Sequence, residues 1–365
     1  MKRNKKYFLT GFLTVFFTLA LAACNAQPLI SYEVTPSKGE IVDFHTELQA
    51  AYLADDYESV ANYASASAEL SRPNAVSLSW EGEESDGYVV ELSVWSDFLN
   101  SKIYETDGPW LDIYNLYAST TYYWRVAPTE KQLKYAEKYT FTTSSAPRNL
   151  YVDGVTNVRD LGGWTTESGK RVKQGLLYRG GRMNTSYAST LTVELTETGW
   201  NTLVNDLGVK TEIDLRGYNQ SEAGGMDNTA IAGVEYVYNG LTWDGNLLTA
   251  NKAEIVRVFE LLAQEETYPA YFHCDIGTDR TGMIAYLLNG VLGVPQEDLY
   301  RDYLYSNFGN IKGNRRNLNG TIRDYVDIIQ KCAGNTYQEQ VETCLLGIGV
   351  QQSTINSIRS ILLED

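Results

Sequence analysis

One short stretch of the sequence, residues 273–282, brings together residue types suited to nucleophilic chemistry on a phosphate group. It contains Cys274 and, six positions later, Arg280, with glycines at positions 277 and 282. The apolar run before it is typical of a buried strand, and the apolar segment after it is typical of a helix that begins near Arg280. A loop between a strand and a helix N-terminus directs several backbone N–H groups to one point, where a phosphate dianion can bind. The expected members of this phosphate-binding loop are Asp275, Ile276, Gly277, Thr278, Asp279, Arg280 and Thr281.

Four residues of this stretch have expected roles. At Cys274 the helix dipole and the converging amides stabilise a thiolate, which is the nucleophilic form of cysteine. Arg280 carries a planar guanidinium that binds two phosphate oxygens at once, which lysine cannot do. Thr281 is expected to donate a hydrogen bond to the Cys274 sulfur, and His273 to shape the loop through hydrogen bonds. A thiol protease is disfavoured, because His273 adjoins Cys274 and neighbouring strand residues point to opposite faces.

The same stretch resembles the Cys-x5-Arg signature of the cysteine-dependent phosphatases. Its longer pattern is similar to that of the bacterial tyrosine phosphatases related to the secreted mycobacterial B-type enzyme. Supporting blocks lie at residues 157–163, 175–179, 213–216, 302–307 and 346–350. The resemblance covers residues 150–365 and implies a two-step reaction, in which Cys274 becomes a phosphocysteine that water then hydrolyses. It implies neither a metal nor another cofactor.

A phenolate leaving group needs a proton, so a carboxylic acid is expected opposite the nucleophile. Asp244 lies 30 residues before Cys274, about where many cysteine phosphatases carry their acid on a loop. Asp279 lies inside the loop, where the closest relatives place an acid with that proposed role. Position and chemistry favour Asp244 slightly, and Asp279 is alternatively a cap of the helix that begins at Arg280. Asp275 is expected to face solvent or to select substrate.

The substrate is expected to be a phosphorylated protein or a small phosphomonoester. Relatives commonly have a lysine where this chain has Thr278, and lysine there adds positive charge for polyanionic substrates. Its absence favours phosphotyrosine or another aryl or simple monoester. The alternatives are a phosphoinositide or dual-specificity phosphatase and, in another class, a non-catalytic adhesion lipoprotein whose loop merely binds an anion.

The N-terminus has the features of an export signal. Four basic residues precede an apolar run at positions 7–23, which is short for a membrane-spanning helix. The run ends at Ala23 and Cys24 in a pattern that resembles a bacterial lipobox, which implies cleavage after residue 23 and a lipid on Cys24. The alternatives are an ordinary signal peptide or an uncleaved anchor. We therefore expect an extracytoplasmic lipoprotein anchored to the cell membrane.

The charge of the chain excludes one class of partner. The whole chain has 46 acidic and 30 basic residues, a net charge of −16. Without residues 1–23, which hold four of the bases, 26 bases stand against 46 acids, a net charge of −20. This acid excess argues against non-specific nucleic-acid binding, which depends on Lys and Arg at the phosphates.

The chain after the signal divides into three parts. Residues 24–70 are predicted to be a tether with a short helix, because apolar residues follow helical spacing within 41–68. Residues 71–145 alternate in short strands and predict a small all-β sandwich. This part resembles a fibronectin type III domain through Leu78, Trp80 and the tyrosine-corner spacing that ends at Tyr122, which implies a spacer or a protein-contact module. Residues 150–365 alternate between strands and helices, which indicates an α/β domain with a mainly parallel sheet.

Two further cysteines and several arginines carry secondary expectations. Cys332 and Cys344 are 12 residues apart and are expected to form a disulfide in an oxidising compartment, with two buried free thiols as the alternative. The basic residues of the supporting blocks divide into two groups. Arg159 and Arg216 are expected to be structural, with Arg216 in a buried ion pair. Arg179 and Arg182 are candidates for contact with substrate.

Overall fold

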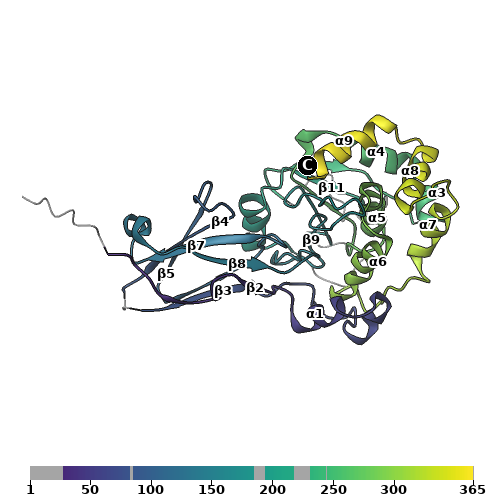
Figure 1. Ribbon diagram of the computed structural model, residues 1–365. Coiled ribbons are helices and arrows are strands. Elements are labelled where there is room, and N and C mark those ends of the chain that lie inside the picture. The colour runs from purple at the N-terminus through teal and green to yellow at the C-terminus, as the bar shows by residue number, and fades with distance from the viewer. Residues whose placement is uncertain (1–27, 83–84, 185–193, 218–230, 244, 365) are drawn as a thin grey trace, which may run out of the picture.

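The computed structural model describes residues 28–82, 85–184, 194–217, 231–243 and 245–364. Two bodies lie side by side in it, a smaller one built of strands and a larger one of strands and helices (Figure 1). The predicted signal segment, Cys24 and Asp244 lie outside the described residues. Among the helices that are described, none is both long and apolar enough to cross a membrane.

The smaller body contains two sheets packed on each other. One sheet has the strand order β1-β3-β6 and the other β2-β8-β7-β4-β5. All neighbouring pairs are antiparallel except β2 and β8. The strands are β1 (Glu33–Thr35), β2 (Glu40–Val42), β3 (Val76–Glu81), β4 (Tyr88–Ser93), β5 (Lys102–Thr106), β6 (Trp110–Ile113), β7 (Thr121–Ala127) and β8 (Tyr139–Thr143), with a short helix η2 (Glu130–Tyr135) between the last two.

Aromatic rings fill the space between these sheets. Trp124 is fully buried and lies 6.3 Å from Trp80 and 5.0 Å from Tyr139 between ring centroids. The hydroxyl of Tyr122 accepts a hydrogen bond from the backbone N–H of Tyr117 at 2.8 Å, which is the geometry of a tyrosine corner. The alternating apolar residues of β3 and β4 thus face a common core, as the sequence predicts.

The larger body is organised around a five-stranded sheet of order β12-β11-β13-β10-β9. The first four strands are parallel to one another and β9 is antiparallel at the edge. The expected α/β domain with a mostly parallel sheet is confirmed. Its strands are β9 (Arg159–Asp160), β10 (Leu177–Gly180), β11 (Thr211–Asp214), β12 (Glu235–Tyr238) and β13 (Ala270–His273).

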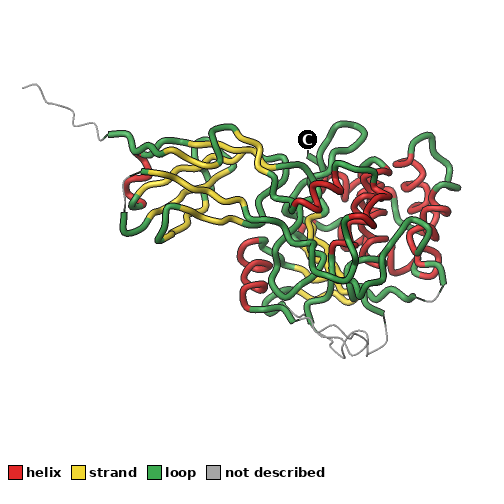
Figure 2. Tube along the Cα trace, turned by 90° about the horizontal axis from the view of Figure 1, so that it is seen from below, coloured by secondary structure: helices red, strands yellow, loops and turns green. Residues whose placement is uncertain are grey.

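Helices cover both faces of this sheet, and most of them gather on one face (Figure 2). The crowded face carries α3 (Leu247–Ala250), α4 (Lys252–Leu262), η4 (Glu265–Thr267), α5 (Arg280–Leu292), α6 (Gln296–Tyr305), η5 (Ser306–Phe308), α7 (Thr321–Ile329), α8 (Tyr337–Ile348) and α9 (Gln352–Leu362). The opposite face packs against α2 (Glu197–Asn201) and the π-helix η3 (Thr202–Asp206). Every residue of α5 is buried, so the helix that follows the candidate loop is fixed in the core.

The segment predicted to be a tether with a short helix, residues 24–70, contains strands as well as helices. Its first part forms β1 and β2 of the small body. The next part, residues 43–75, connects β2 to β3 and crosses to the larger body, and we name it the strap. The strap contains α1 (Glu47–Leu53) and η1 (Tyr57–Asn62), and α1 lies beside the larger body in Figure 1. Its apolar residues pack on α6 and η5. The ring centroids of Tyr52 and Phe308, for example, lie 5.7 Å apart. The apolar face predicted within residues 41–68 is therefore covered by the larger body.

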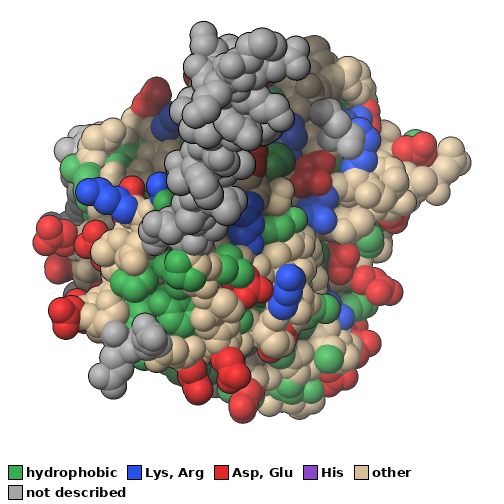
Figure 3. Space-filling view, turned by 60° about the vertical axis from the view of Figure 1, so that its left-hand side comes forward, with side chains coloured by type: hydrophobic (Ala, Val, Ile, Leu, Met, Phe, Trp, Pro, Cys, Tyr) green, Lys and Arg blue, Asp and Glu red, His purple; other side chains and the backbone are tan. Residues whose placement is uncertain are grey.

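Acidic side chains do not gather in one patch on the face shown in Figure 3. Asp and Glu lie scattered there along the left, lower and right-hand edges. The expected disulfide between the two C-terminal cysteines is not formed in this structure, because Cys332 and Cys344 are free thiols. They are neighbours, and burial together with the Cys332 sulfur raises the pKa of Cys344 to about 12. Their oxidation to a disulfide stays a prediction.

Candidate active site

The candidate loop lies at the carboxyl edge of the parallel sheet. Strand β13 sits between β11 and β10 and ends at His273, and α5 begins at Arg280. Ligands of open α/β sheets bind beyond this edge, where strands give way to helices. Cys274 is 2% exposed and Arg280 is 1% exposed. The structure therefore brings the two predicted residues together in one enclosed loop.

The backbone of this loop requires glycine at position 277. Gly277 has a φ of 70°, in the left-handed region that favours glycine. A Cβ there would lie 2.3 Å from the carbonyl carbon of Gly180 and 2.7 Å from the amide nitrogen of Gly181. The loop thus packs directly on the backbone that follows β10, and any side chain at 277 would push the two segments apart.

Two side chains hold loop carbonyl groups from outside. The amide nitrogen of Asn157 donates to the carbonyl oxygens of Ile276 and Gly277, both at 3.2 Å. Arg179 Nη2 donates to the Gly277 carbonyl at 2.9 Å. In a trans peptide the N–H points opposite to the carbonyl. The N–H groups of Gly277 and Thr278 therefore point away from Asn157, as an anion-binding loop requires.

A buried carboxylate anchors both supporting arginines. Asp302 accepts a hydrogen bond from Arg159 Nε at 2.6 Å and another from Arg179 Nη1 at 2.5 Å. Burial opposes its ionisation, but the two guanidinium groups hold the pKa of Asp302 below its ordinary value. Burial and the nearby Arg159 lower the pKa of Arg179 to about 10. Arg179 thus lies behind the loop as a support, and Arg159 is structural as expected.

Asp275 is held by two cations from distant parts of the chain. Arg182 pairs with it from the segment after β10, and Lys312 Nζ lies 2.8 Å from its other carboxylate oxygen. Burial opposes the effect, but Lys312 and Arg182 lower the pKa of Asp275. Lys312 was not recognised in the sequence, because nothing in the local pattern of residues 309–317 indicates a partner 37 residues away.

A family profile described as "Tyrosine phosphatase family" matches residues 150–364, more than half of the chain. This chain belongs to the tyrosine phosphatase family. A protein of Cupriavidus necator named "Putative tyrosine-protein phosphatase H16_A0669" is 30% identical over 193 residues, which are 47% of this chain and 67% of that protein.

Two solved structures are also similar to part of this chain. One is the core catalytic domain of the PP-IP phosphatase SIW14 from S. cerevisiae, with 14% identity over 50% of this chain and 86% of that one, at a TM-score of 0.29. The other is TpbA of P. aeruginosa, with 19% identity over 49% of this chain and 89% of that one, at a TM-score of 0.30. These scores carry no weight in the assignment, which rests on the family profile.

Membership makes the protein a hydrolase of the cysteine-dependent class, with a phosphorylated substrate. The geometry of the loop is consistent with this chemistry. Cys274 lies at the start of the loop and Arg280 at its end. Between them, Asn157 and Arg179 hold the loop carbonyl groups from outside. The loop therefore brings a thiol, a guanidinium group and oriented N–H groups together within one short stretch of chain.

The two candidate acids of this phosphatase have different surroundings. Both carboxylate oxygens of Asp279 accept from Arg316, at 2.7 and 2.6 Å, and the Tyr303 hydroxyl adds a third bond at 3.2 Å. Asp279 makes no side-chain cap to α5, so the capping alternative is wrong. Asp244 lies outside the described residues, but the ring of its neighbour Trp243 lies 5.1 Å from the Arg280 guanidinium.

Two other sequence expectations have different outcomes. His273 shapes the loop as expected, because its ring nitrogens lie 3.1 Å from the Cys274 carbonyl oxygen and 3.0 Å from Glu212 Oε1. The Thr281 hydroxyl is buried and has no hydrogen-bond partner among the described residues. Its expected bond to the Cys274 sulfur is therefore not formed.

A buried ion pair flanks the loop on the side of β11. Arg216 Nε donates to both oxygens of Asp214 at 3.0 Å, as the sequence analysis expects for this arginine. Burial raises the pKa of Asp214, but His273 and Arg216 outweigh burial and bring it to about 2. The Tyr236 hydroxyl donates to the same carboxylate at 2.9 Å. The pair fixes the strand end beside His273.

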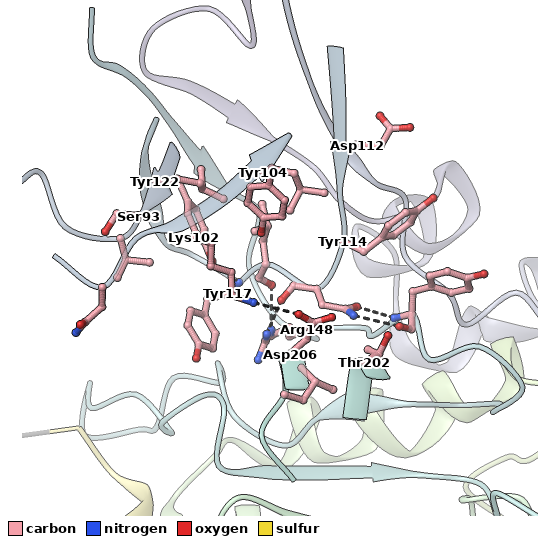
Figure 4. A pocket seen from close by; sticks show the side chains of 18 of the residues that line it. Ser93, Lys102, Tyr104, Asp112, Tyr114, Tyr117, Tyr122, Arg148, Thr202 and Asp206 are labelled. Carbon is pink, nitrogen blue, oxygen red and sulfur yellow. Dashed lines mark hydrogen bonds and ion pairs between the residues drawn. The ribbon is translucent and has the colours of Figure 1, made fainter. Parts of the chain in front are cut away.

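A separate cavity lies between the two bodies of the phosphatase (Figure 4). Its volume is about 460 Å³, and its walls combine tyrosines of the small body, such as Tyr104, with Thr202 and Asp206 of η3. Lys102 and Asp206 approach to 3.5 Å across the bodies. No residue of the catalytic loop is among its described lining residues, so this cavity is not part of the candidate active site.

Proposed function

We propose that this protein is an extracytoplasmic, lipid-anchored protein-tyrosine phosphatase that acts through a phosphocysteine on Cys274. The observation that carries the proposal is the loop geometry. The nucleophile and Arg280 border a turn whose carbonyl groups are held outward by Asn157 and Arg179. Such a turn stabilises the equatorial oxygens of a phosphoryl group in transfer.

The proposed reaction has two steps. The Cys274 thiolate attacks phosphorus, an S–P bond forms, and the bond between phosphorus and the phenolic oxygen breaks with its electrons on that oxygen. A carboxylic acid gives this oxygen a proton, so the free phenol leaves. Water then attacks the phosphocysteine, loses a proton to the carboxylate, and releases inorganic phosphate and the thiolate. Arg280 binds the phosphoryl oxygens in both steps.

We assign the acid to Asp244. Asp279 has both oxygens engaged by Arg316 and a third bond from Tyr303, so its carboxylate is already committed to partners within the chain. The position of Trp243 over the Arg280 guanidinium supports Asp244, because it brings the chain to the mouth of the loop one residue before it. This assignment is a proposal.

The charges around the loop favour a simple monoester over a polyanion. Two cations lie beside the loop besides Arg280: Arg182, which the sequence indicated, and Lys312, which it did not. Both are paired with Asp275, and Arg316 is paired with Asp279. The extra cations are thus balanced locally, so they add little net positive charge for a polyanionic substrate. The runner-up is a phosphoinositide or dual-specificity phosphatase.

The location outside the cytoplasm rests on the N-terminal sequence. The basic start, the apolar run and Cys24 together support cleavage and lipidation. The small body then stands between the lipid and the catalytic body, which suits a spacer or a site for a protein partner. Metabolic labelling with a fatty acid, lost in Cys24→Ala, tests the anchor without reference to the enzymatic activity.

Hydrolysis of an aryl phosphate by the purified protein tests the central proposal. We expect turnover in the wild type and none above background in Cys274→Ser, with the same thermal unfolding in both. A panel of phosphotyrosine peptides, phosphoserine peptides and phosphoinositide vesicles then measures specificity, and preference for the lipids would contradict the monoester reading. For the acid, Asp244→Asn is expected to slow esters with poor leaving groups more than esters with good ones, and Asp279→Asn is the matched control.

A further inference from the structure

The strap reaches the catalytic loop from outside the family domain. Its residue Ala66 is 1% exposed and packs against Ile276 of the loop and against Ile311. The Ala66 carbonyl accepts from the N–H groups of Ile311 at 3.0 Å and Gly313 at 2.8 Å. The strap lies before residue 150, where the family match begins, so this contact comes from outside the part of the chain that matches the family profile.

Ala66 adopts a backbone conformation that alanine rarely takes. Its φ is 63°, in the left-handed region, and this costs about 1–2 kcal/mol for a residue with a Cβ. Such a conformation persists only where surrounding contacts determine it, and it is frequent at functional sites. Three backbone hydrogen bonds hold it, the two already named and one from Ala66 N–H to the Asn307 carbonyl at 3.0 Å.

Five residues later the strap makes a second connection. Ser71 is 4% exposed, and its Oγ accepts a hydrogen bond from the backbone N–H of Asn157 at 3.0 Å. The Ser71 hydroxyl itself donates to one carboxylate oxygen of Glu69. The Thr156 hydroxyl donates to the other oxygen of Glu69. Two strap side chains thus bind the backbone of Asn157 and the side chain of Thr156.

Asn157 connects these strap contacts to the catalytic loop. It is completely buried, has a left-handed φ of 60°, and donates to the carbonyl oxygens of Ile276 and Gly277. Its side-chain oxygen accepts from Arg159 Nη1 at 2.6 Å. A chain of hydrogen bonds therefore runs from Glu69 through Ser71 and Asn157 to the two peptide groups whose N–H groups serve the phosphate.

We propose that Ser71, supported by Glu69, is a positioning residue of this phosphatase and that the strap completes its active site. Ser71 fixes Asn157, and Asn157 keeps the loop peptides turned for phosphate. The inference rests on the proposed function of the loop as a phosphate site. It implies that residues 150–365 hold the chemistry but lack one support of the loop. A merely structural strap would lower stability alone and leave the phosphate geometry intact.

Four full-length variants test this proposal: Ser71→Ala, Asn157→Ala, the double variant and the control Ser67→Ala. Ser67 is an exposed residue of the same strap, and among the described residues its hydroxyl donates to the Ser65 carbonyl two positions earlier. For each variant, kcat and KM for an aryl phosphate, the inhibition constant of inorganic phosphate and the thermal unfolding midpoint are measured. Glu69→Gln serves as a second probe of the same chain if Ser71→Ala folds poorly.

We expect Ser71→Ala to lower kcat about tenfold and to weaken inhibition by phosphate about as much, since one hydrogen bond of the chain is lost. The double variant should be little worse than Asn157→Ala, because the two residues act in series. Ser67→Ala should match the wild type. Additive losses in the double variant, or a Ser71→Ala enzyme with unchanged kcat and phosphate inhibition, would overturn the proposal.

The same design separates this inference from the proposed function. If the wild type showed no hydrolysis, the proposed function would fail, but binding of inorganic phosphate by calorimetry would still test the strap. Weaker phosphate binding in Ser71→Ala than in Ser67→Ala would then support positioning of the loop. Equal binding in the two variants would contradict it.

Discussion

The core of the small body and the surroundings of the catalytic loop are both buried, but they are built from opposite kinds of side chain. Between the two sheets lie aromatic rings such as Trp124, Trp80 and Tyr139. Behind and beside the catalytic loop lie five arginines, none more than 1% exposed, which are Arg159, Arg179, Arg182, Arg216 and Arg280. The first region is stabilised by the hydrophobic effect, and the second contains charges that must be paired.

This difference separates stability from function within one chain. Burying a paired charge is costly or neutral for stability, whereas removing one partner of the pair is strongly destabilising. The arginines around the loop are therefore retained for the geometry and the positive charge that an anion site needs. The aromatic core has no such second task, and its substitution should affect only stability. The predictions below test this separation.

The largest effect is expected at the arginine that meets the substrate. Arg280→Lys keeps the charge but loses the planar fork, so kcat/KM should fall about a hundredfold to a thousandfold with little change in the unfolding midpoint. Steady-state hydrolysis of an aryl phosphate measures this loss. A lysine variant with activity within about twofold of the wild type would show that point charge alone suffices.

Asp302→Asn is expected to affect stability and activity together. It leaves Arg159 and Arg179 without their shared carboxylate, which should cost about 3–5 kcal/mol in the free energy of unfolding. Because Arg179 also holds the Gly277 carbonyl, kcat should fall as well. Urea unfolding and kinetics on the same preparation check both effects. A loss of stability with unchanged kcat would show that the ion pairs of Asp302 do not support the loop.

Trp124→Ala in the small body is the counterpart of that variant. The cavity it leaves should cost about 3–5 kcal/mol, similar to the loss at Asp302. Below the unfolding transition, however, kcat and KM should equal those of the wild type, because Trp124 belongs to the core of the small body, which includes no residue of the catalytic loop among its described members. A large fall in kcat with the strap and the loop still folded would show that the two regions are not separable.

Acid should weaken the catalytic body through Asp214. The pKa of Asp214 is about 2 in the folded protein, below its ordinary value of 3.8. A depressed pKa contributes stability above the unfolded value, here about 2 kcal/mol, and this is lost as the pH falls from about 4 toward 2. Urea unfolding across this range should show a shallower dependence on pH in Asp214→Asn. An unchanged slope would contradict the shift.

The smallest effect is expected at the rim of the loop. Lys312 is about one-third exposed and pairs with Asp275 at 2.8 Å, and exposed pairs contribute about 0.2–1 kcal/mol. Lys312→Ala should therefore raise KM for an aryl phosphate a fewfold and leave kcat unchanged, and added salt should reduce the difference. A fall in kcat larger than the rise in KM would show that Lys312 contributes to the chemical step.

The sequence alone predicted the loop, the parallel sheet and most strands, because their signals are local. Cys274 and Arg280 lie within one short stretch, and Val76, Leu78 and Trp80 alternate within one strand. The helix α4 at Lys252–Leu262 follows an apolar repeat that is visible in the sequence. Such patterns need no knowledge of which distant segment covers them.

The rest depends on contacts between segments far apart in the chain. Asn157 and Ser71 are 86 residues apart, and Asp279 and Arg316 are 37 apart. No periodicity connects residues at these separations, so the sequence predicted a short helix within the strap but not its packing on the catalytic body.

Mass spectrometry of the protein quenched during turnover of an aryl phosphate tests the central claim most directly. The account predicts one phosphoryl group covalently bound to the peptide that contains Cys274, absent in Cys274→Ser and more abundant when hydrolysis of the intermediate is slow. Turnover without any phosphorylated Cys274, or the same turnover in Cys274→Ser, would contradict it.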